Sequence, residues 1–218
     1  MNYEYCVVSY PKCGRTWLRL IVLEYCKFLQ IDETPSLYTH INFGIGGNGE
    51  YPRIAYLKNH PETPAFMLTR DPADTLVSYY HDDMVRGQKG KMKDVRGDID
   101  AYCRENLSHL QQFYQSASEY NYVATLRYED MIADTYTSIL PLFETVYKDL
   151  DKDLLAKAVE KCEFDNVAKK ERSGELNMRV RSDHMEAGFY KTRKGKVGSA
   201  KEELTAETFE WIQEQLSK

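Results

Sequence analysis

An apolar run that passes through a short turn into an amphipathic stretch is the feature that most constrains this fold. Tyr5–Ser9 (YCVVS) predicts a strand, residues 10–15 the turn, and residues 16–29 a helix. The apolar side chains of that helix repeat with a period of about 3.6 residues: Trp17, Leu20, Ile21 and Phe28. A strand that feeds directly into a helix is the building unit of parallel α/β folds. The pattern therefore predicts an α/β core.

Further strands are predicted where apolar residues run continuously. Residues 54–57, Ala65–Thr69 (AFMLT) and residues 122–126 lack the alternation of a half-exposed strand. Continuous apolar strands are typical of a sheet that helices cover on both faces. We therefore expect a three-layer fold in which helices flank a central, mostly parallel sheet of about four to five strands.

Two helices are predicted in the middle of the chain. Asp71, Pro72 and Asp74 supply an N-cap, a proline at the first helical position and an acid at the third, so a helix should begin at once. Apolar residues at helical spacing predict one long helix over Ile99–Ala117.

Composition limits the possible classes of protein. With 218 residues, of which 42% are hydrophobic and 29% charged, the chain predicts one globular domain over residues 1–218 and excludes a disordered or fibrous protein. A formal net charge of −5 disfavours binding to nucleic acid. Five scattered cysteines support neither a zinc site nor a disulfide framework, and no carboxylate follows a strand as a magnesium ligand would. Because no apolar run reaches the ~18 residues of a membrane span, we expect a cytoplasmic protein.

The first chemical motif lies between the first strand and its helix, at residues 10–17 (YPKCGRTW). A helix amino terminus offers N–H groups and a partial positive charge, Gly14 lets an anion approach the backbone, and Lys12 adds a full charge. The segment therefore favours a phosphate cradle, although a capped turn with a surface lysine is the plain alternative. It is not the nucleotide-triphosphatase loop, because the G-x-x-x-x-G-K-[ST] order is absent.

A second motif occupies residues 69–81 (TRDPADTLVSYYH), again at the end of a predicted strand. The fork of the Arg70 guanidinium and the hydroxyl of Ser78, two turns into the helix, suit one anion beside that helix. Alone, such an arginine is more often part of a surface ion pair.

A third segment, residues 189–198 (FYKTRKGKVG), places four cations and two glycines within ten residues. Its charge suits an anion as well, although a basic run alone is usually a solvated surface segment.

Together these segments resemble the cytosolic sulfotransferases, whose motifs occur here in the same order. The matching patterns are Y-P-K-x-G-x-T-W, R-x-P-x-D-x-x-x-S-Y-Y-H and F-x-x-x-R-K-G-x-x-G. Two shorter matches, Y-E-D-M at residues 128–131 and Phe164, lie between the second and third motifs. The resemblance implies a P-loop-like fold. It also implies transfer of a sulfuryl group from 3′-phosphoadenosine 5′-phosphosulfate (PAPS) to a hydroxyl or amine of a small-molecule acceptor.

The resemblance also assigns roles to residues. The 5′ phosphosulfate and the adenine beside it fall to the residues of the first loop, Lys12, Cys13, Gly14, Arg15, Thr16 and Trp17. The 3′ phosphate falls to Arg70, Ser78, Arg193, Lys194 and Gly195, and adenine also to Tyr128 and Phe164. The chain departs from the family at Cys13, where serine is usual, and at Arg15, where threonine is usual.

Transfer needs a base for the acceptor proton and cations for the developing charge. His60 is the candidate base, because Lys58-Asn59-His60-Pro61 resembles the family's K-T-H-x-P. An imidazole with an ordinary pKa of about 6.5 is a suitable acceptor at neutral pH. Lys12 would then neutralise the leaving oxygen and Lys58 the equatorial oxygens, in an in-line transfer. His81 is a weaker rival for the base.

Other predictions concern partners and alternatives. The sequence does not identify the acceptor, since the segment between His60 and Arg70 is shorter than in the family. Lys201, Thr205 and Glu210 outline a short dimerisation motif of the family, which favours a weak homodimer. The alternative functions are a P-loop-type kinase and a non-catalytic nucleotide-binding protein.

Overall fold

The computed structural model describes residues 3–34, 36–39, 57, 59–85, 97–175, 192 and 194–216. The chain divides into two compact units that alternate along the sequence. The first unit comprises Met1–Arg70 and Gln112–Cys162, and the second comprises Asp71–Gln111 and Glu163–Lys218. One domain over residues 1–218 stays a prediction.

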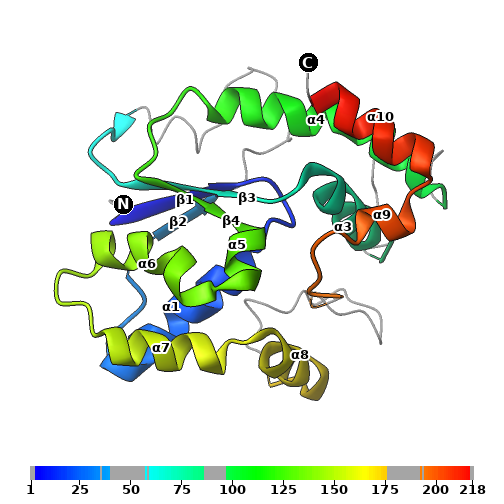
Figure 1. Ribbon diagram of the computed structural model, residues 1–218. Helices are drawn as coiled ribbons and strands as arrows, with labels where there is room; N and C mark the ends of the chain where they lie inside the picture. The colour runs from blue at the N-terminus through cyan, green and yellow to red at the C-terminus, as the bar shows by residue number, and fades with distance from the viewer. Residues whose placement is uncertain are drawn as a thin grey trace. The chain divides into compact units, whose positions relative to one another are not determined.

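The first unit contains a four-stranded sheet in which every strand pair is parallel (Figure 1). Its strands are β1 (Tyr5–Ser9), β2 (Ser36–Thr39), β3 (Ala65–Thr69) and β4 (Ala124–Arg127). Their order across the sheet is β2-β1-β3-β4. The chain moves from β1 to one side for β2 and to the other side for β3, so the strand order reverses between β1 and β3. In parallel sheets, ligands bind at the carboxyl ends of the strands beside such a reversal.

The predicted α/β fold with a central parallel sheet is confirmed, but one strand was missed. β2 (SLYT) has no apolar run, and it joins the sheet through its pairing with β1. Of the predicted strand at 54–57, only Leu57 is described, and it is helical. The expected cover on both faces is also wrong for β4, where Thr125 and Arg127 are exposed. β4 lies at the edge of the described sheet, where helices need not cover both of its faces.

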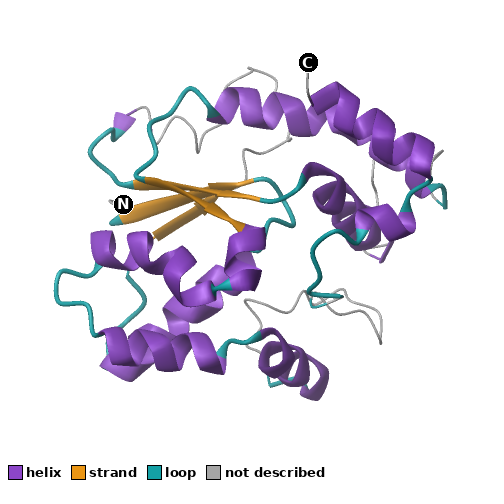
Figure 2. Cartoon of the chain, viewed as in Figure 1, coloured by secondary structure: helices purple, strands orange, loops and turns teal. Residues whose placement is uncertain are grey.

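Helices lie on both sides of the sheet in the first unit (Figure 2). On one side are α1 (Arg15–Leu29), α5 (Tyr128–Ala133) and α6 (Thr135–Val146), and α7 (Lys152–Lys161) packs against α1. The carboxyl-terminal part of α4 (Ile99–Ala117) covers the other side, where the Phe113 ring meets Tyr10 edge-on at 5.5 Å between centroids.

The predicted helix after β1 is confirmed, with a different buried face. Its fully buried apolar residues are Leu18, Ile21, Val22 and Tyr25. Of the four residues predicted from the period, only Ile21 is buried, because the sheet and α7 together cover a face rotated by one residue.

The second unit is built of helices. It contains α3 (Pro72–Val85), the amino-terminal part of α4, α8 (Phe164–Ser173), α9 (Ala200–Glu203) and α10 (Ala206–Leu216). The predicted start of α3 is confirmed: the Asp71 carboxylate accepts a hydrogen bond from the N–H of Asp74 at 2.8 Å. The long helix α4 has the predicted bounds. All five cysteines of the chain are buried thiols.

Candidate functional site

The loop after β1 leads into the amino terminus of α1 at the carboxyl edge of the sheet. Lys12 has a left-handed backbone (φ 72°), and Gly14, the N-cap of α1, also has a positive φ of 94°. The N-cap Gly14 makes no side-chain cap bond, and the first turn of α1 has no acidic residue. The positive end of a 15-residue helix dipole is therefore available to an anion at this loop.

Gly14 is required at its position for two reasons. Only glycine adopts φ 94° without strain. In addition, a Cβ on Gly14 would stand 2.7 Å from Cδ2 of Tyr128, so any larger residue would collide with this ring. Tyr128 follows β4 directly, and its ring packs against the backbone of the loop at Gly14.

Tyr128 is the centre of an aromatic and cationic cluster. The Arg70 guanidinium lies over its ring at 4.4 Å from the centroid, and Trp17 meets it edge-on at 6.1 Å. The indole Nε1 of Trp17 donates to the carbonyl oxygen of Cys162 at 2.7 Å, which fixes the indole. A cation over an aromatic face is favourable by about 0.5–2 kcal/mol, depending on exposure.

Arg70 also reaches the phosphate loop itself. Its Nη1 donates to the carbonyl oxygen of Lys12 at 3.1 Å. The two residues follow β1 and β3, which lie side by side with Ser9 opposite Leu68. Within the first unit, the fold therefore brings Lys12, Gly14, Trp17, Arg70 and Tyr128 to the edge where the strand order reverses. Arg15 and Thr16, in the first turn of α1, are partly exposed.

Cys13 is fully buried beneath the loop, beside Tyr114 of α4. Burial, with a contribution from the neighbouring Cys13, raises the pKa of the Tyr114 phenol. The Tyr114 hydroxyl donates to the carbonyl oxygen of Arg70 at 3.4 Å. Tyr114 thus supports the same loop and strand end, a role that its place in a helical repeat did not predict.

His60 does not lie at this edge. It precedes β3, in a turn closed by the bond from the N–H of Thr63 to its carbonyl oxygen, whereas Lys12 follows β1. Because β1 and β3 are parallel, their five residues, about 16 Å of strand, separate the two ends. The His60 Nδ1 lies 3.2 Å from Oε1 of Glu62. The expected meeting of His60 and Lys12 is therefore not found, and Lys58 lies outside the described residues.

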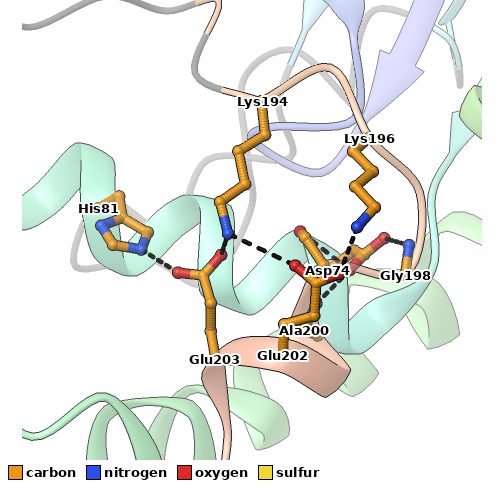
Figure 3. Close-up of polar contacts among 9 residues, drawn as sticks. Asp74, His81, Lys194, Lys196, Gly198, Ala200, Glu202 and Glu203 are labelled. Carbon is orange, nitrogen blue, oxygen red and sulfur yellow. Dashed lines mark hydrogen bonds and ion pairs between the residues drawn. The ribbon is translucent and has the colours of Figure 1, made fainter.

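In the second unit, Asp74 anchors residues 194–200, here called the late loop, to α3 (Figure 3). Its fully buried carboxylate accepts hydrogen bonds from the N–H groups of Gly198 (2.7 Å) and Ala200 (2.8 Å), and Ser199 Oγ lies 3.4 Å away. The sequence predicted Asp74 only as an acid in the first turn of its helix. Ser78, one turn further along α3, is partly exposed.

The late loop also packs on α8. Gly195 has φ 58°, and a Cβ there would stand 2.4 Å from Cε2 of Phe164. Thr192 donates from both its N–H and its hydroxyl to Oε2 of Glu171. The second unit therefore brings Phe164 and Gly195 into contact. Arg193 lies outside the described residues.

Glu203 of α9 joins two side chains of the second unit, Lys194 and His81 (Figure 3). Its carboxylate lies 2.9 Å from Lys194 Nζ and 2.6 Å from His81 Nε2. Lys196 pairs with the neighbouring Glu202 and lowers its pKa. Lys194, the predicted phosphate ligand, is thus held by an acid of its own chain.

Comparison with known proteins matches residues 61–218 to the sulfotransferase domain. The chain belongs to the sulfotransferase domain family. The match includes Arg70, Ser78, Tyr128, Phe164 and the late loop, and it begins after the first loop.

Relatives among sulfotransferases cover nearly the whole chain. The rabbit (Oryctolagus cuniculus) amine sulfotransferase is 24% identical, with 94% of this chain and 76% of the relative covered. Mouse (Mus musculus) sulfotransferase 2A2 is 27% identical, with 94% and 81% covered. Because these alignments extend over 94% of the chain, they reach well beyond the 61–218 match.

Solved sulfotransferase-like structures share the fold. A mouse sulfotransferase complexed with PAP superimposes with a TM-score of 0.66 at 17% identity, covering 98% of this chain and 83% of that one. Retinol dehydratase in complex with androsterone and the inactive cofactor PAP gives a TM-score of 0.64 at 16% identity, with 100% and 81% covered. The P-loop-like fold predicted for this sulfotransferase family member is therefore confirmed.

Two properties of the described residues bear on the remaining predictions. None of the helices in the described ranges is both long and apolar enough to cross a bilayer. No group of three or more His, Cys, Asp or Glu side chains there is arranged to hold a metal ion. The cytoplasmic compartment stays a prediction.

Proposed function

We propose that this chain transfers the sulfuryl group of PAPS to a hydroxyl or amine of a small-molecule acceptor. One observation supports this most: the amino terminus of α1, Lys12 and Arg70 lie together at the sheet edge where the strand order reverses. The chain belongs to a family of this activity. The G-x-x-x-x-G-K-[ST] loop that a kinase of the P-loop type would need is absent.

The residues of the first unit fit the 5′ phosphosulfate. Lys12 supplies a cation, α1 supplies the positive end of its dipole, and Gly14 lets the anion approach the backbone. In the transfer, the acceptor oxygen or nitrogen bonds to sulfur while the bond from sulfur to the bridging oxygen of the 5′ phosphate breaks, and adenosine 3′,5′-bisphosphate leaves with that electron pair. Lys12 would stabilise the negative charge on the bridging oxygen.

The remaining donor contacts belong to the proposal as well. Trp17 and Tyr128 offer aromatic surface to adenine in the first unit, and Phe164 in the second. Arg70, Ser78, Lys194 and Gly195, with Arg193 next to the late loop, would bind the 3′ phosphate. Thr16 would add its hydroxyl to the 5′ phosphosulfate, and Cys13 and Arg15 complete the binding loop.

For the base, His60 remains the residue proposed from the sequence. Because it precedes β3 whereas Lys12 follows β1, it would have to act on the acceptor from the other end of β3. The acceptor proton would pass to the imidazole as the acceptor attacks sulfur. Lys58 remains a predicted ligand of the sulfuryl oxygens.

A weak homodimer through Lys201, Thr205 and Glu210 remains part of the proposal. Lys201 and Glu210 are exposed. Thr205, however, donates from its N–H and hydroxyl to Asp100 of its own chain and accepts the N–H of Thr208. A dimer would have to form around a threonine that already caps α10.

The function is tested by ligand preference and then by transfer. We expect adenosine 3′,5′-bisphosphate to raise the thermal unfolding midpoint more than ATP with magnesium, because the chain has residues for a 3′ phosphate. Transfer of labelled sulfate from PAPS to a panel of phenols, alcohols and amines should follow, and it should fall at least about 100-fold in Lys12→Ala. The exposed Lys157 of α7 provides the matched control, Lys157→Ala.

Each alternative function has its own outcome. Preference for ATP with magnesium would favour the kinase. Preference for the bisphosphate without transfer to any acceptor would favour the non-catalytic nucleotide-binding protein.

A further inference from the structure

Arg70 and Lys12 belong to neighbouring strand ends, and their contact involves the backbone of the phosphate loop. The guanidinium Nη1 donates to the carbonyl oxygen of Lys12 at 3.1 Å. β1 and β3 are paired up to Ser9 and Leu68, so both chains have just left the sheet at this point. A side chain at the end of one strand therefore holds the loop that follows the other.

The backbone that Arg70 holds is an unusual one. Among the described residues, Lys12 and Gln30 are the non-glycine residues with positive φ, at 72° and 57°. Gln30 is the C-cap of α1, where this conformation is common. Lys12 lies in no helix cap, and a left-handed lysine persists only where its surroundings impose that conformation. The hydrogen bond from Arg70 is one such constraint, because it fixes the direction of the Lys12 carbonyl.

Arg70 is itself fixed by the ring that contacts the other end of the loop. The guanidinium lies 4.4 Å from the centroid of Tyr128, and the same ring is so close to Gly14 that a Cβ there would be 2.7 Å from it. The Tyr114 hydroxyl bonds to the Arg70 carbonyl oxygen at 3.4 Å. The Tyr128 ring therefore contacts both Arg70 and Gly14, and so fixes the position of the guanidinium relative to the loop.

We propose that Arg70 is a positioning residue for the 5′ phosphosulfate loop: it holds Lys12 in the left-handed conformation that aims the loop at the 5′ group. This inference rests on the proposed function. It has a consequence that a contact with the 3′ phosphate alone lacks. Removal of the Arg70 guanidinium should impair recognition of the 5′ group even in a ligand that has no 3′ phosphate.

The test removes the 3′ phosphate from the ligand and the guanidinium from the protein. Binding of adenosine 5′-monophosphate and of adenosine 3′,5′-bisphosphate is measured by titration calorimetry for wild type, Arg70→Gln and Arg70→Lys. Transfer is measured with adenosine 5′-phosphosulfate and with PAPS. Arg127→Gln is the matched control, because Arg127 ends β4 at the same edge of the sheet, is 60% exposed and carries the same charge.

If Arg70 positions the loop, Arg70→Gln weakens binding of the 5′-monophosphate at least about fivefold, because the loss of a hydrogen bond from a charged donor has at least this magnitude. Arg127→Gln leaves the affinity for the 5′-monophosphate unchanged. Arg70→Lys keeps the charge but not the fork, so it should lose 5′-monophosphate affinity too. The kcat with adenosine 5′-phosphosulfate should fall along with the affinity.

The opposite result is equally clear. If Arg70→Gln binds the 5′-monophosphate as wild type does, and loses only its preference for the bisphosphate, Arg70 is a 3′-phosphate ligand alone and the inference is overturned. Should Arg70→Gln not fold, Arg70→Lys decides by the same criterion. Failure of the proposed function looks different, since wild type itself would then show no preference for the bisphosphate and no transfer.

Discussion

The Phe164 ring lies against the backbone of Gly195, so closely that a Cβ on this glycine would be 2.4 Å from the ring. Gly195 also has φ 58°, a conformation that costs an alanine about 1–2 kcal/mol. Substitution here has both a conformational and a steric cost, whereas at Gly97 and Gly198, which also have positive φ, it has only the first. The contact therefore links the late loop to the aromatic residue proposed for adenine.

We expect Gly195→Ala to lower the affinity for adenosine 3′,5′-bisphosphate at least about tenfold, because Phe164 must move to admit the methyl group. Gly198→Ala is the matched control: φ is 79° there, and nothing lies within 4 Å of its Cβ. Calorimetric titration and urea unfolding of both variants test this. Equal losses of affinity in the two would show that the ring contact is irrelevant to binding.

Asp74→Asn should release the late loop from α3. The buried carboxylate accepts two backbone N–H groups, from Gly198 and Ala200, and the two bonds go to different oxygens. Asparagine offers one acceptor oxygen and places an NH₂ group opposite the other donor, so we expect a loss of about 2–3 kcal/mol in the free energy of unfolding. Affinity for the bisphosphate should fall while that for adenosine 5′-monophosphate stays unchanged.

The control for Asp74→Asn is Asp151→Asn. Asp151 is the exposed N-cap of α7, where its carboxylate accepts the N–H of Leu154, and asparagine caps a helix as well as aspartate does. If Asp74→Asn proved as harmless as Asp151→Asn, the buried anchor would have no energetic weight.

Glu203→Gln should affect binding and stability in opposite directions. The carboxylate pairs with Lys194 and also contacts His81, so its loss removes a negative charge that competes with phosphate for Lys194. We expect a severalfold gain in bisphosphate affinity and a drop of about 1 kcal/mol in the free energy of unfolding. Glu207→Gln, at a side chain that is 85% exposed, should change neither. Lower bisphosphate affinity in Glu203→Gln would mean that Glu203 orients Lys194 instead.

Alkaline pH should destabilise the protein through its buried thiols. Burial raises the pKa of Cys6 and of Cys103 from an ordinary value of 9.0 to about 12. Below pH 9 both states keep these protons, and above it the unfolded chain releases them while the native protein does not. The free energy of unfolding should therefore fall as pH rises from about 9 towards 12, by at most ~1.4 kcal/mol per pH unit for each thiol.

Urea unfolding at pH 7.5, 9 and 10 measures this slope. Cys6→Ala removes one of the two thiols, so its slope between pH 9 and 10 should be shallower than that of wild type. An identical slope in both proteins would exclude Cys6 as a source of the pH dependence.

The role of His60 as the base can be tested by substitution. His60→Asn should lower kcat at least about 100-fold, because it removes the proposed base, and leave bisphosphate affinity intact. Initial rates at saturating PAPS measure this, and an unchanged kcat in His60→Asn would exclude His60 as the base.

Much of this fold follows from local sequence patterns. Apolar runs predicted β1 and β3, and the Asp-Pro pair and helical periodicity predicted α3 and α4, because strand propensity, capping and period act within a few residues. β2 escaped notice, since its SLYT sequence becomes a strand only through pairing with β1. The order of the sulfotransferase-like motifs along the chain was enough to predict the family and the phosphate loop at Lys12.

Relations across the chain needed the tertiary structure. That Lys12 and Arg70 share a sheet edge while His60 does not depends on parallel pairing of β1 with β3, and no local pattern contains the order of strands. The partners of Asp74 lie 124 and 126 residues away. The sequence by itself thus determined which residues could bind a sulfated nucleotide. Only the packing of distant segments decided which of them meet, because contact depends on the path of the whole chain.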